Sequence, residues 1–494
     1  MEDEAQRVER VAQARVQSGG GGKSKTSRQA ANNANTIDGF VASSAQAKEI
    51  RARVLASLAK DGIDSVRIVL VDLHGVPRAK LLSAKHFERV ITAGHSWPLP
   101  LLAADLWEEM TPTETALGVD VGWDNGVLMP DLRTFVKLPW TRSTAHVIAD
   151  FFRSTGEEMP SPRQVLARVL RQAFAAGYEP VFGTELEFYV FKPELGDAGF
   201  NAVFGRQSWF SVNALGLAQQ FTDALGDAVR RMDLPVYEIF SEKGAGQFEI
   251  NLEPGSGVGA IDNVVALKIA IKEVAQTLGL RATFLARPTN LWETPTSGYH
   301  LHQMLKDLSG DNAFYDPTAT DSLSAVCRHY IGGQIAHATG MTAIAAPTVT
   351  AYKRYIAGTN APSGATWAVG NRSALLRALP MGENTHLENR LGSSDANPYL
   401  LAAVNVAAGL DGIAKQTDPG EPGHGNMWAS VEDRFQRLPT TLIDGVAAYA
   451  ADAVLVQSLG EDFSRIFTGL LRNDWKRYTE HVTDWEIREY REIL

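Results

Sequence analysis

The stretch Gly183-Thr184-Glu185-Leu186-Glu187-Phe188 places two glutamates two positions apart, with apolar residues between and after them. Three later segments repeat this spacing of polar side chains: Gln247-Phe248-Glu249, His300-Leu301-His302 and Glu388-Asn389-Arg390. Residues i and i+2 of a β-strand point to the same face of a sheet. Interpreted as strands, the four segments predict one sheet wall with carboxylates, imidazoles and a guanidinium, which indicates a polar funnel that can hold metal ions.

The composition is that of a folded chain with a net negative charge. The chain has 494 residues, of which 45% are hydrophobic, and its 47 basic and 57 acidic residues give a formal charge of −10. This charge argues against nucleic-acid binding as the main role. The single cysteine, Cys327, excludes an internal disulfide framework and suits a reducing compartment. With no hydrophobic signal region and no membrane-spanning apolar run in the sequence, we expect a cytoplasmic protein without a membrane partner.

The order of the predicted elements divides the chain into three regions. Residues 1–48 are polar and low in complexity, which predicts a flexible N-terminal extension. Residues 49–141 contain short strand patterns and leave little room for helix, which predicts a small β-rich domain. In residues 142–494 strand and helix patterns alternate, which predicts a large domain with a mixed sheet backed by helices. The predicted fold class is therefore α+β.

Carboxylates dominate the predicted wall. Two carboxylates side by side repel each other unless a cation or a proton lies between them. One glutamate alone would most simply be a solvated charge, but several glutamates on strand faces indicate a site. Carboxylates with an imidazole and without thiolates favour Mg²⁺ or Mn²⁺ over structural zinc, and the set is large enough for two or more ions. The predicted ligands are Glu185, Glu187, Glu242, Glu249, His300 and Glu388.

A second group of candidate residues is cationic. It consists of Arg354, Arg372, Arg377 and Arg390. Planar guanidinium groups bind carboxylates and phosphates through two parallel hydrogen bonds. Arginines beside a carboxylate-bound metal are what phosphoryl transfer from a nucleotide requires. The sequence has no Walker-type loop and no kinase motif set, so a nucleotide would be held by a different architecture.

Together, these segments resemble the glutamine synthetase superfamily over about residues 60–494, and within it the γ-glutamylamide ligase branch typified by γ-glutamylanilide synthase. The matching stretches are Gly183–Phe188, Gly244–Glu249, Ser297–His302, Asn371–Ala374 and Asp395–Leu400. The resemblance implies an N-terminal β-grasp domain at 49–141 and a catalytic ATP- and metal-binding domain at 142–494, whose mixed sheet forms a half-barrel funnel. It also implies a homo-oligomer, a dodecamer of two stacked hexameric rings with active sites between subunits.

The resemblance also implies roles for individual residues and an activity. The first metal would be held by Glu187, Glu242 and Glu249, and the second by Glu185, His300 and Glu388. The ATP phosphates would face His302, Arg372 and Arg377, while glutamate would be held by Arg354 and Arg390 with Gly298 beside its amino group. ATP would phosphorylate the γ-carboxylate of glutamate, and an amine would then displace the phosphate from γ-glutamyl phosphate.

The chain departs from ammonia-using members of this family at the predicted amine pocket. Asn360 stands where those members carry a flap glutamate, within Gly358–Pro362. The segment His95–Leu102, which includes Trp97, is apolar and bulky where they carry an aspartate. An asparagine cannot pair by charge with ammonium. We therefore expect Asn360, Trp97 and His95 to line a pocket for a hydrophobic or aromatic amine such as aniline, which is already neutral near pH 7.

Three alternatives remain open at this stage. A γ-glutamylpolyamine synthetase and an ordinary glutamine synthetase that uses ammonia would share the metal and phosphate machinery. A catalytically inactive family member is the alternative of another class. All six predicted metal ligands are present in the sequence, which disfavours the inactive alternative.

Overall fold

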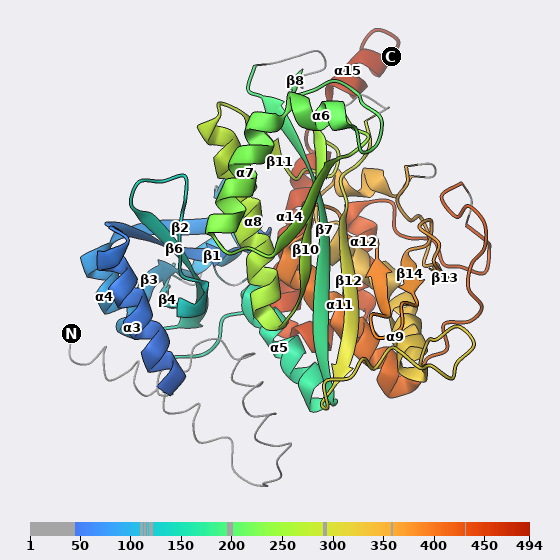
Figure 1. Cartoon of the computed structure of the whole chain (residues 1–494). Coiled ribbons are helices and arrows are strands. Elements are labelled where there is room, and N and C mark those ends of the chain that lie inside the picture. Colours follow the sequence, from blue (N-terminus) through green and yellow to red (C-terminus); the bar gives the residue numbers. More distant parts are fainter. Residues whose placement is uncertain are drawn as a thin grey trace.

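The structure is a computed structural model that describes residues 45–108, 112, 115, 117, 122–194, 201–289, 294–356, 359–429 and 431–494 (Figure 1). Most of the predicted N-terminal extension, residues 1–44, lies outside the described residues. Helix α3 begins at Ala45 and ends at Lys60.

A small mixed sheet forms the N-terminal part of the molecule. Its strands are β1 (Ser65–Val71), β2 (Pro77–Ser83), β3 (His95–Pro98), β4 (Asn125–Pro130), β5 (Val136–Lys137) and β6 (Thr144–Arg153). The order is β2-β1-β6-β4-β3, and β1 runs antiparallel to β2 but parallel to β6. Helix α4 (Ala84–Ala93) follows the β1–β2 hairpin and buries Phe87, Val90 and Ile91. A hairpin, a helix and a parallel central pair make up the predicted β-grasp arrangement.

The pairing of β6 bears on where the first domain ends. The sequence places the division between residues 141 and 142, which assigns β6 to the catalytic domain. In the structure β6 lies inside the small sheet, between β1 and β4. Helix α5 (Pro162–Ala175) is the first helix after it. Because a division at 141 would cut a hydrogen-bonded sheet, we propose that the boundary lies between β6 and α5.

A larger sheet forms the centre of the molecule. Its strands are β7 (Tyr178–Lys192), β8 (Asn201–Ala202), β9 (Val236–Ser241), β10 (Gln247–Ser256), β11 (Arg281–Thr283), β12 (Tyr299–Asp307), β13 (Trp367–Val369), β14 (Leu376–Leu379) and β15 (His386–Asn389). The main order is β13-β14-β15-β12-β7-β10-β9, with β13 parallel to β14. The sheet is mixed and curls into a half-barrel around the long strands β7, β10 and β12 (Figure 1), which confirms the predicted fold class.

Helices pack behind and around this sheet, and the last of them, α15, projects from one end of the molecule (Figure 1). They are α5, α6 (Val212–Leu217), α7 (Gln219–Arg231), α8 (Gly257–Thr277), α9 (Ala325–Ala336), α10 (Ala338–Ala345), α11 (Pro398–Lys415), α12 (Leu442–Ala451), α13 (Ala453–Leu459), α14 (Glu461–Thr479) and α15 (Asp484–Tyr490). Thirteen residues of α11 are buried, as expected for a helix that is apolar on all sides. Among the described residues no single helix is long and apolar enough to cross a membrane, and only the sharply bent pair α12 and α13 meets that criterion jointly.

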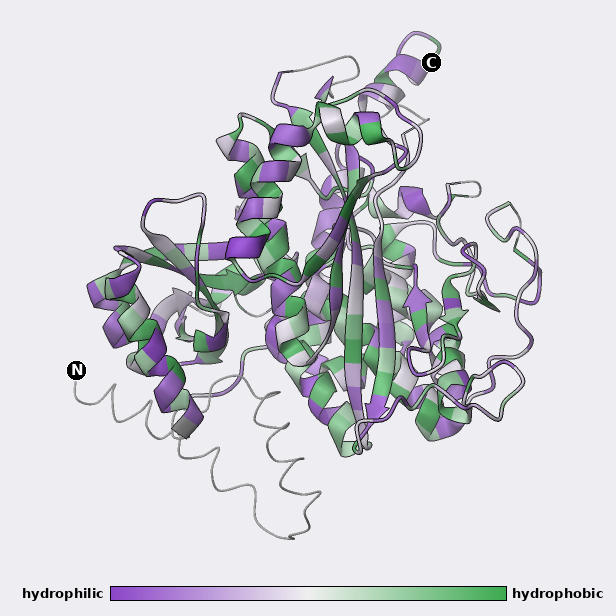
Figure 2. Ribbon diagram, viewed as in Figure 1, coloured by the Kyte–Doolittle hydropathy of each residue, from purple (hydrophilic) through white to green (hydrophobic). Residues whose placement is uncertain are grey.

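Because side chains alternate between the two faces of a sheet, the core and the funnel lie on opposite sides of the long strands. Leu186 and Phe188 of β7 are fully buried, and the Phe188 ring contacts Phe248 of β10 and Phe221 of α7. Glu185 and Glu187 alternate with these residues and point to the opposite face. Hydrophilic and hydrophobic residues accordingly alternate along the long strands (Figure 2). One face of the sheet therefore carries the aromatic core, and the other is left for charged side chains.

A buried arginine joins the two sheets. Arg163 of α5 donates from Nη1 to Asp150 of β6 (2.8 Å) and from Nη2 to Asp131 (2.6 Å). Its Nε and Nη2 also donate to the two carboxylate oxygens of Asp262 in α8, at 2.9 and 2.8 Å. Burial by itself would raise the pKa of Asp131, but Arg163 and Arg133 outweigh it and hold that pKa far below its usual range. One guanidinium therefore balances carboxylates from both domains.

We expect Arg163→Met to destabilise the fold strongly, because methionine fills similar space but leaves the buried carboxylates of Asp150 and Asp262 without a cation, while Asp131 keeps only Arg133. Breaking a buried ion pair from one side costs about 3–5 kcal/mol. The shift of the denaturant midpoint measures the loss. Arg230→Met is the matched control, since Arg230 pairs with Asp227 on the surface at 2.6 Å, and the change there should stay within about 0.5 kcal/mol. Equal midpoints for the two variants would contradict this prediction.

Candidate active site

Strand register brings the predicted ligands of the funnel wall together. Glu187 of β7 pairs with Glu249 of β10, and Glu185 pairs with His300 of β12. On the other side of β12, His302 pairs with Glu388 of β15. Strand β7 therefore lies between β10, which carries the carboxylate of Glu249, and β12, which carries the imidazoles of His300 and His302. The segments that the sequence singled out by their i, i+2 spacing are adjacent strands of one curved wall.

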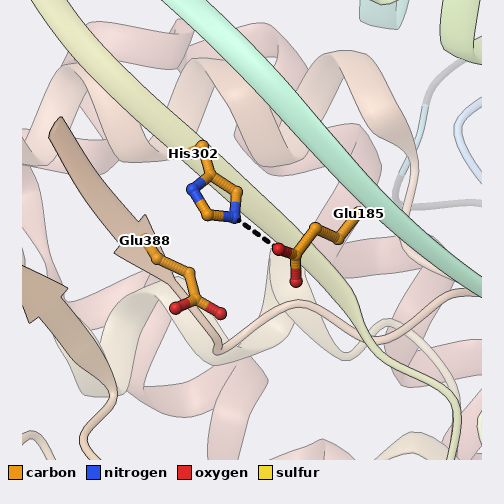
Figure 3. Close-up of side chains that lie close together, drawn as sticks. All are labelled: Glu185, His302 and Glu388. Atoms are coloured by element: carbon orange, nitrogen blue, oxygen red, sulfur yellow. Dashed lines mark hydrogen bonds and ion pairs between the residues drawn. The ribbon is translucent and has the colours of Figure 1, made fainter. Parts of the chain in front are cut away.

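One half of the wall combines carboxylates and histidines. The Nδ1 atom of His300 lies 3.1 Å from Glu185 Oε2, and His302 Nε2 lies 2.9 Å from Glu185 Oε1. Single donor atoms of Glu185, His302 and Glu388 all lie within 4.8 Å of one another, as metal ligands would (Figure 3). His300 is the residue the sequence proposed as a ligand here, and its Nδ1 is 3.7 Å from Glu388. The structure therefore offers two imidazoles to this position.

Protein cations balance the charge of this half. Glu388 is fully buried, and Arg377 Nη1 donates to its Oε2 at 3.1 Å while Arg390 Nη1 donates to its Oε1. Burial opposes ionisation, but the charges of Arg390 and His300 lower the pKa of Glu388 to about 2. Burial also opposes ionisation of Glu185, yet hydrogen bonds from the two histidines hold its pKa well below the usual range. Both carboxylates are therefore anionic at neutral pH.

The other half of the wall gathers carboxyl groups that no basic side chain of the described residues neutralises. Burial and the charge of Glu242 raise the pKa of Glu187 to about 8. Burial and the charges of Glu185, Glu187 and Glu242 raise the pKa of Glu249 to about 10. Glu242, which follows β9, also has a raised pKa because it is buried. Within the described part of the chain, no lysine or arginine forms an ion pair with these three side chains. Oxygen donors without a protein counter-ion fit a divalent cation such as Mg²⁺ or Mn²⁺.

Neighbouring polar groups orient these carboxylates. Glu187 Oε2 accepts hydrogen bonds from the Gly298 amide (2.9 Å) and from Gln247 Nε2 (3.1 Å). Glu242 Oε1 accepts from Trp209 Nε1 at 2.8 Å. The sequence assigned no role to Gln247 or Trp209. Gln247 could have been found from its position two residues before Glu249, whereas Trp209 lies far from the matched segments and carries no comparable signal.

Two of the predicted arginines are buried next to the wall with an unpaired atom. Arg354 lies in the short helix η6 (Ala351–Arg354), and its Nη1 donates to the carbonyl oxygen of Gly392 at 2.6 Å. The Nε atoms of Arg354 and Arg390 are buried and have no hydrogen-bond partner among the described residues. A Cβ atom on Gly298 would lie 2.9 Å from Arg354 Nη2 and 2.7 Å from His300 Nε2, so a side chain there would displace one or both of these groups. Buried, partly unsatisfied guanidinium groups fit a bound carboxylate.

The remaining predicted cations lie near β14. Arg377 is on β14, opposite Glu388, and its Nε also donates to the Gly370 carbonyl at 3.2 Å. Arg372 is exposed in the turn before β14. A pocket of about 230 Å³ is lined by Arg287, Thr289, Thr350 and Lys353. Its lining is polar and cationic, so this pocket does not itself supply a hydrophobic site for an amine.

The residues predicted to line an amine pocket are dispersed. Asn360 is exposed and has a left-handed backbone with φ of 61°, while residue 358 of the same flap lies outside the described residues. Trp97 and His95 lie on β3 of the small sheet, away from the funnel (Figure 1). Trp97 is 2% exposed and packs in the hydrophobic core. Because its apolar ring stabilises the small domain, the structure of one chain does not place Trp97 in an amine pocket.

Known proteins resemble this chain over most of its length. The family profile "Glutamine synthetase, catalytic domain" matches residues 159–490. The glutamine synthetase of Thermotoga maritima is 33% identical over 383 residues, which cover 74% of this chain and 84% of that protein. The glutamate–isopropylamine ligase of a Pseudomonas species is 28% identical, covering 88% and 96%. The gamma-glutamylanilide synthase of an Acinetobacter species is also 28% identical, covering 90% and 95%.

A solved structure described as "GmaS/ADP complex-Conformation 1" superposes with a TM-score of 0.78 at 31% identity, covering 89% of this chain and 99% of that one. The profile match extends over more than half of the chain, and its bounds contain every residue of the funnel wall described above. The fold, the arrangement of carboxylates and arginines, and these similarities together show that the chain belongs to the glutamine synthetase family of ligases.

Proposed function

We propose that the protein is an ATP-dependent ligase that joins the γ-carboxylate of L-glutamate to an organic amine. One observation carries the proposal: buried arginines with unsatisfied nitrogens lie next to a sheet wall whose buried carboxylates have no protein counter-ion among the described residues. The carboxylates fit divalent cations, and the arginines fit a substrate carboxylate. Such a combination suits phosphoryl transfer from a nucleotide to an acid.

Different side chains in and beside the wall have different roles in the proposed reaction. Bound Mg²⁺ or Mn²⁺ would neutralise charge on the ATP phosphates, and the ligand residues are the glutamates together with His300 or His302. Arg354 and Arg390 hold the carboxylate of glutamate, which leaves its γ-carboxylate free to attack the terminal phosphorus of ATP as ADP departs. Arg377 and His302 stabilise the charge on the transferred group, with Arg372 near the same strand. The amine nitrogen then attacks the acyl carbon, loses a proton, and phosphate departs.

The proposed amine is hydrophobic or aromatic, with aniline as the model compound. Asn360 supports this proposal, because it is neutral and exposed where ammonia-using relatives are expected to carry a glutamate. A neutral arylamine needs no carboxylate to remove a proton before it attacks. Two relatives whose names include isopropylamine and anilide cover 88% and 90% of this chain. Experiments must distinguish this proposal from three alternatives: a ligase that uses polyamines, a ligase that uses ammonia, and a catalytically inactive protein.

We also propose that the enzyme is a cytoplasmic homo-oligomer, a dodecamer of two stacked hexameric rings. The C-terminal helix α15 supports self-association, because none of its residues is buried in the single chain. Its side chains include Trp485 and Tyr490, which are 54% and 48% exposed. Sedimentation velocity at micromolar concentration gives the subunit number, and a monomer there would contradict this assembly.

Cation affinity should increase with pH. Glu187 and Glu249 have pKa values raised to about 8 and about 10 without a cation, so both must release protons to bind one. The affinity for Mn²⁺ should rise by about tenfold per pH unit for each released proton. Without metal, the folded state holds more protons than the unfolded state above the ordinary pKa of 4.5, so its free energy of unfolding should fall as pH rises toward 8. Calorimetry in buffers of different ionisation enthalpy counts the protons, and a pH-independent affinity would contradict the assignment.

Glu187→Ala should abolish turnover and spare the fold. Loss of a metal ligand removes several kcal/mol of charge stabilisation, so kcat should fall by about 100-fold or more. Glu179→Ala, at the solvent end of the same strand, should retain activity. The measurements are product formation from ATP and glutamate together with circular dichroism. Unchanged turnover in Glu187→Ala would contradict an enzymatic role for the wall.

A panel of amines tests the proposed substrate. Mass spectrometry of products from ATP, glutamate and equimolar ammonia, aniline, isopropylamine and putrescine should show the anilide as the main product. Asn360→Asp keeps the side-chain size and tolerates the left-handed backbone, and its added charge should shift kcat/KM toward ammonium by about tenfold, or 1.4 kcal/mol. Asn360→Gly fits the same backbone without a charge and should not cause this shift. Turnover with ammonia but with neither aniline nor isopropylamine would refute the proposed specificity.

A further inference from the structure

Amide side chains form a buried cluster directly behind the histidine half of the wall. The cluster, here termed the amide network, consists of Gln303 on β12, Asn389 on β15, Gln334 and Tyr330 on α9, and Asn405 on α11. Each of these side chains is 2% exposed or less. Gln303 follows His302, and Asn389 follows Glu388, so each network residue on a strand points to the helices while its neighbour points into the funnel. The network therefore lies one sheet thickness behind the candidate ligands.

Hydrogen bonds connect the two strands through the helices. Asn405 Oδ1 accepts from Gln303 Nε2 at 3.0 Å and from Asn389 Nδ2 at 2.7 Å. Asn389 Nδ2 also donates to Gln334 Oε1 at 2.9 Å, and Gln334 Nε2 donates to Gln303 Oε1 at 3.0 Å. The Tyr330 hydroxyl donates to the same Gln303 oxygen at 2.8 Å. Burying an amide side chain costs free energy unless it forms hydrogen bonds. Here Gln303 and Asn389 each have hydrogen-bond partners on both α9 and α11.

The backbone ladder that joins β15 to β12 is short. Strand β15 has four residues, all of which pair with β14 on one edge, but on the other edge it meets β12 only through the pairs Leu301–Asn389, His302–Glu388 and Gln303–Leu387. A slip of one residue would turn Glu388 toward the helices and Asn389 into the funnel, because side chains alternate along a strand. Apolar residues behind so short a ladder would tolerate that slip, whereas directional bonds from Asn389 to Asn405 and Gln334 would not.

The same asparagine also shapes the segment that carries Arg390. Asn389 Oδ1 accepts a hydrogen bond from the backbone amide of Leu391 at 2.9 Å. This bond closes a turn around Arg390, whose guanidinium contacts Glu388. Both amide atoms of Asn389 are therefore used: its nitrogen fixes the strand against the helices, and its oxygen fixes the turn.

We propose that the amide network is a positioning device that sets the register of β15 against β12, and thereby places Glu388, His302 and Arg390 for cation and glutamate binding. The inference rests on the proposed function for the roles of these three residues. The network residues lie on the face of the sheet opposite the funnel. Their contribution is to keep a short strand from sliding or tilting under the mutual repulsion of the funnel carboxylates.

The test compares variants by Mn²⁺ binding, followed by electron paramagnetic resonance, and by steady-state kinetics. Asn405→Leu keeps the side-chain volume and removes both bonds to Oδ1. Its affinity for Mn²⁺ should fall by about 10- to 100-fold, as when groups behind metal ligands are lost, and the KM for glutamate should rise. Tyr330→Phe removes only the bond to Gln303 and preserves the packing, so its loss of affinity should be smaller. If Asn405→Leu does not fold, Tyr330→Phe decides the question.

Thr468→Val is the matched control for stability. Thr468 is a buried residue of α14 whose hydroxyl donates to the Ser464 carbonyl at 2.8 Å, far in sequence from both strands. It should lower Tm and leave Mn²⁺ affinity unchanged. Wild-type affinity in a folded Asn405→Leu and in Tyr330→Phe, or an equal loss in Thr468→Val, would overturn the inference. A wild-type protein that binds Mn²⁺ but forms no γ-glutamylamide would instead refute the proposed function and leave the binding comparison valid.

Discussion

Mutual repulsion of carboxylates on one face of a sheet is the constraint around which this molecule is organised. Glu187 and Glu249 pair across β7 and β10, with Glu185 on the same face. At this spacing and degree of burial, carboxylates ionise together only if positive charge is supplied. The fold supplies it to one half of the wall only. Arg377, Arg390 and the two histidines balance that half, whereas the other half keeps raised pKa values and fits a cation from outside.

This division gives the wall two chemically distinct halves within a few strands. Next to the histidine half, the arginines neutralise carboxylate charge and keep nitrogen atoms available for a ligand. In the glutamate half, Gln247, Trp209 and the Gly298 amide orient carboxylate oxygens without neutralising them. A metal-dependent ligase needs both properties, because it must bind cations tightly and still recognise an anionic substrate. The glutamine synthetase family membership accounts for the arrangement as a whole.

Polar groups inside the core hold this charged wall in place. Arg163 connects carboxylates of β6 and α8 and so fixes the small domain against the large one. The amide network connects β12 and β15 to α9 and α11. In both cases hydrogen bonds provide direction that hydrophobic packing lacks, because an apolar contact changes little when a strand slips by one residue. The aromatic core behind β7 supplies stability, and these polar clusters supply register.

The sequence by itself determined the wall, because the i, i+2 spacing of residues such as Glu185 and Glu187 or His300 and His302 is a local property of strands. It could also indicate a cation site, since the types of donor are visible in the chain. Only the tertiary structure decided which side chains meet. It placed His302 as well as His300 at Glu185, assigned β6 to the small sheet, brought Trp209 to Glu242, and buried Trp97 in the core. These outcomes depend on pairings between segments far apart in the chain, and no local periodicity encodes such pairings.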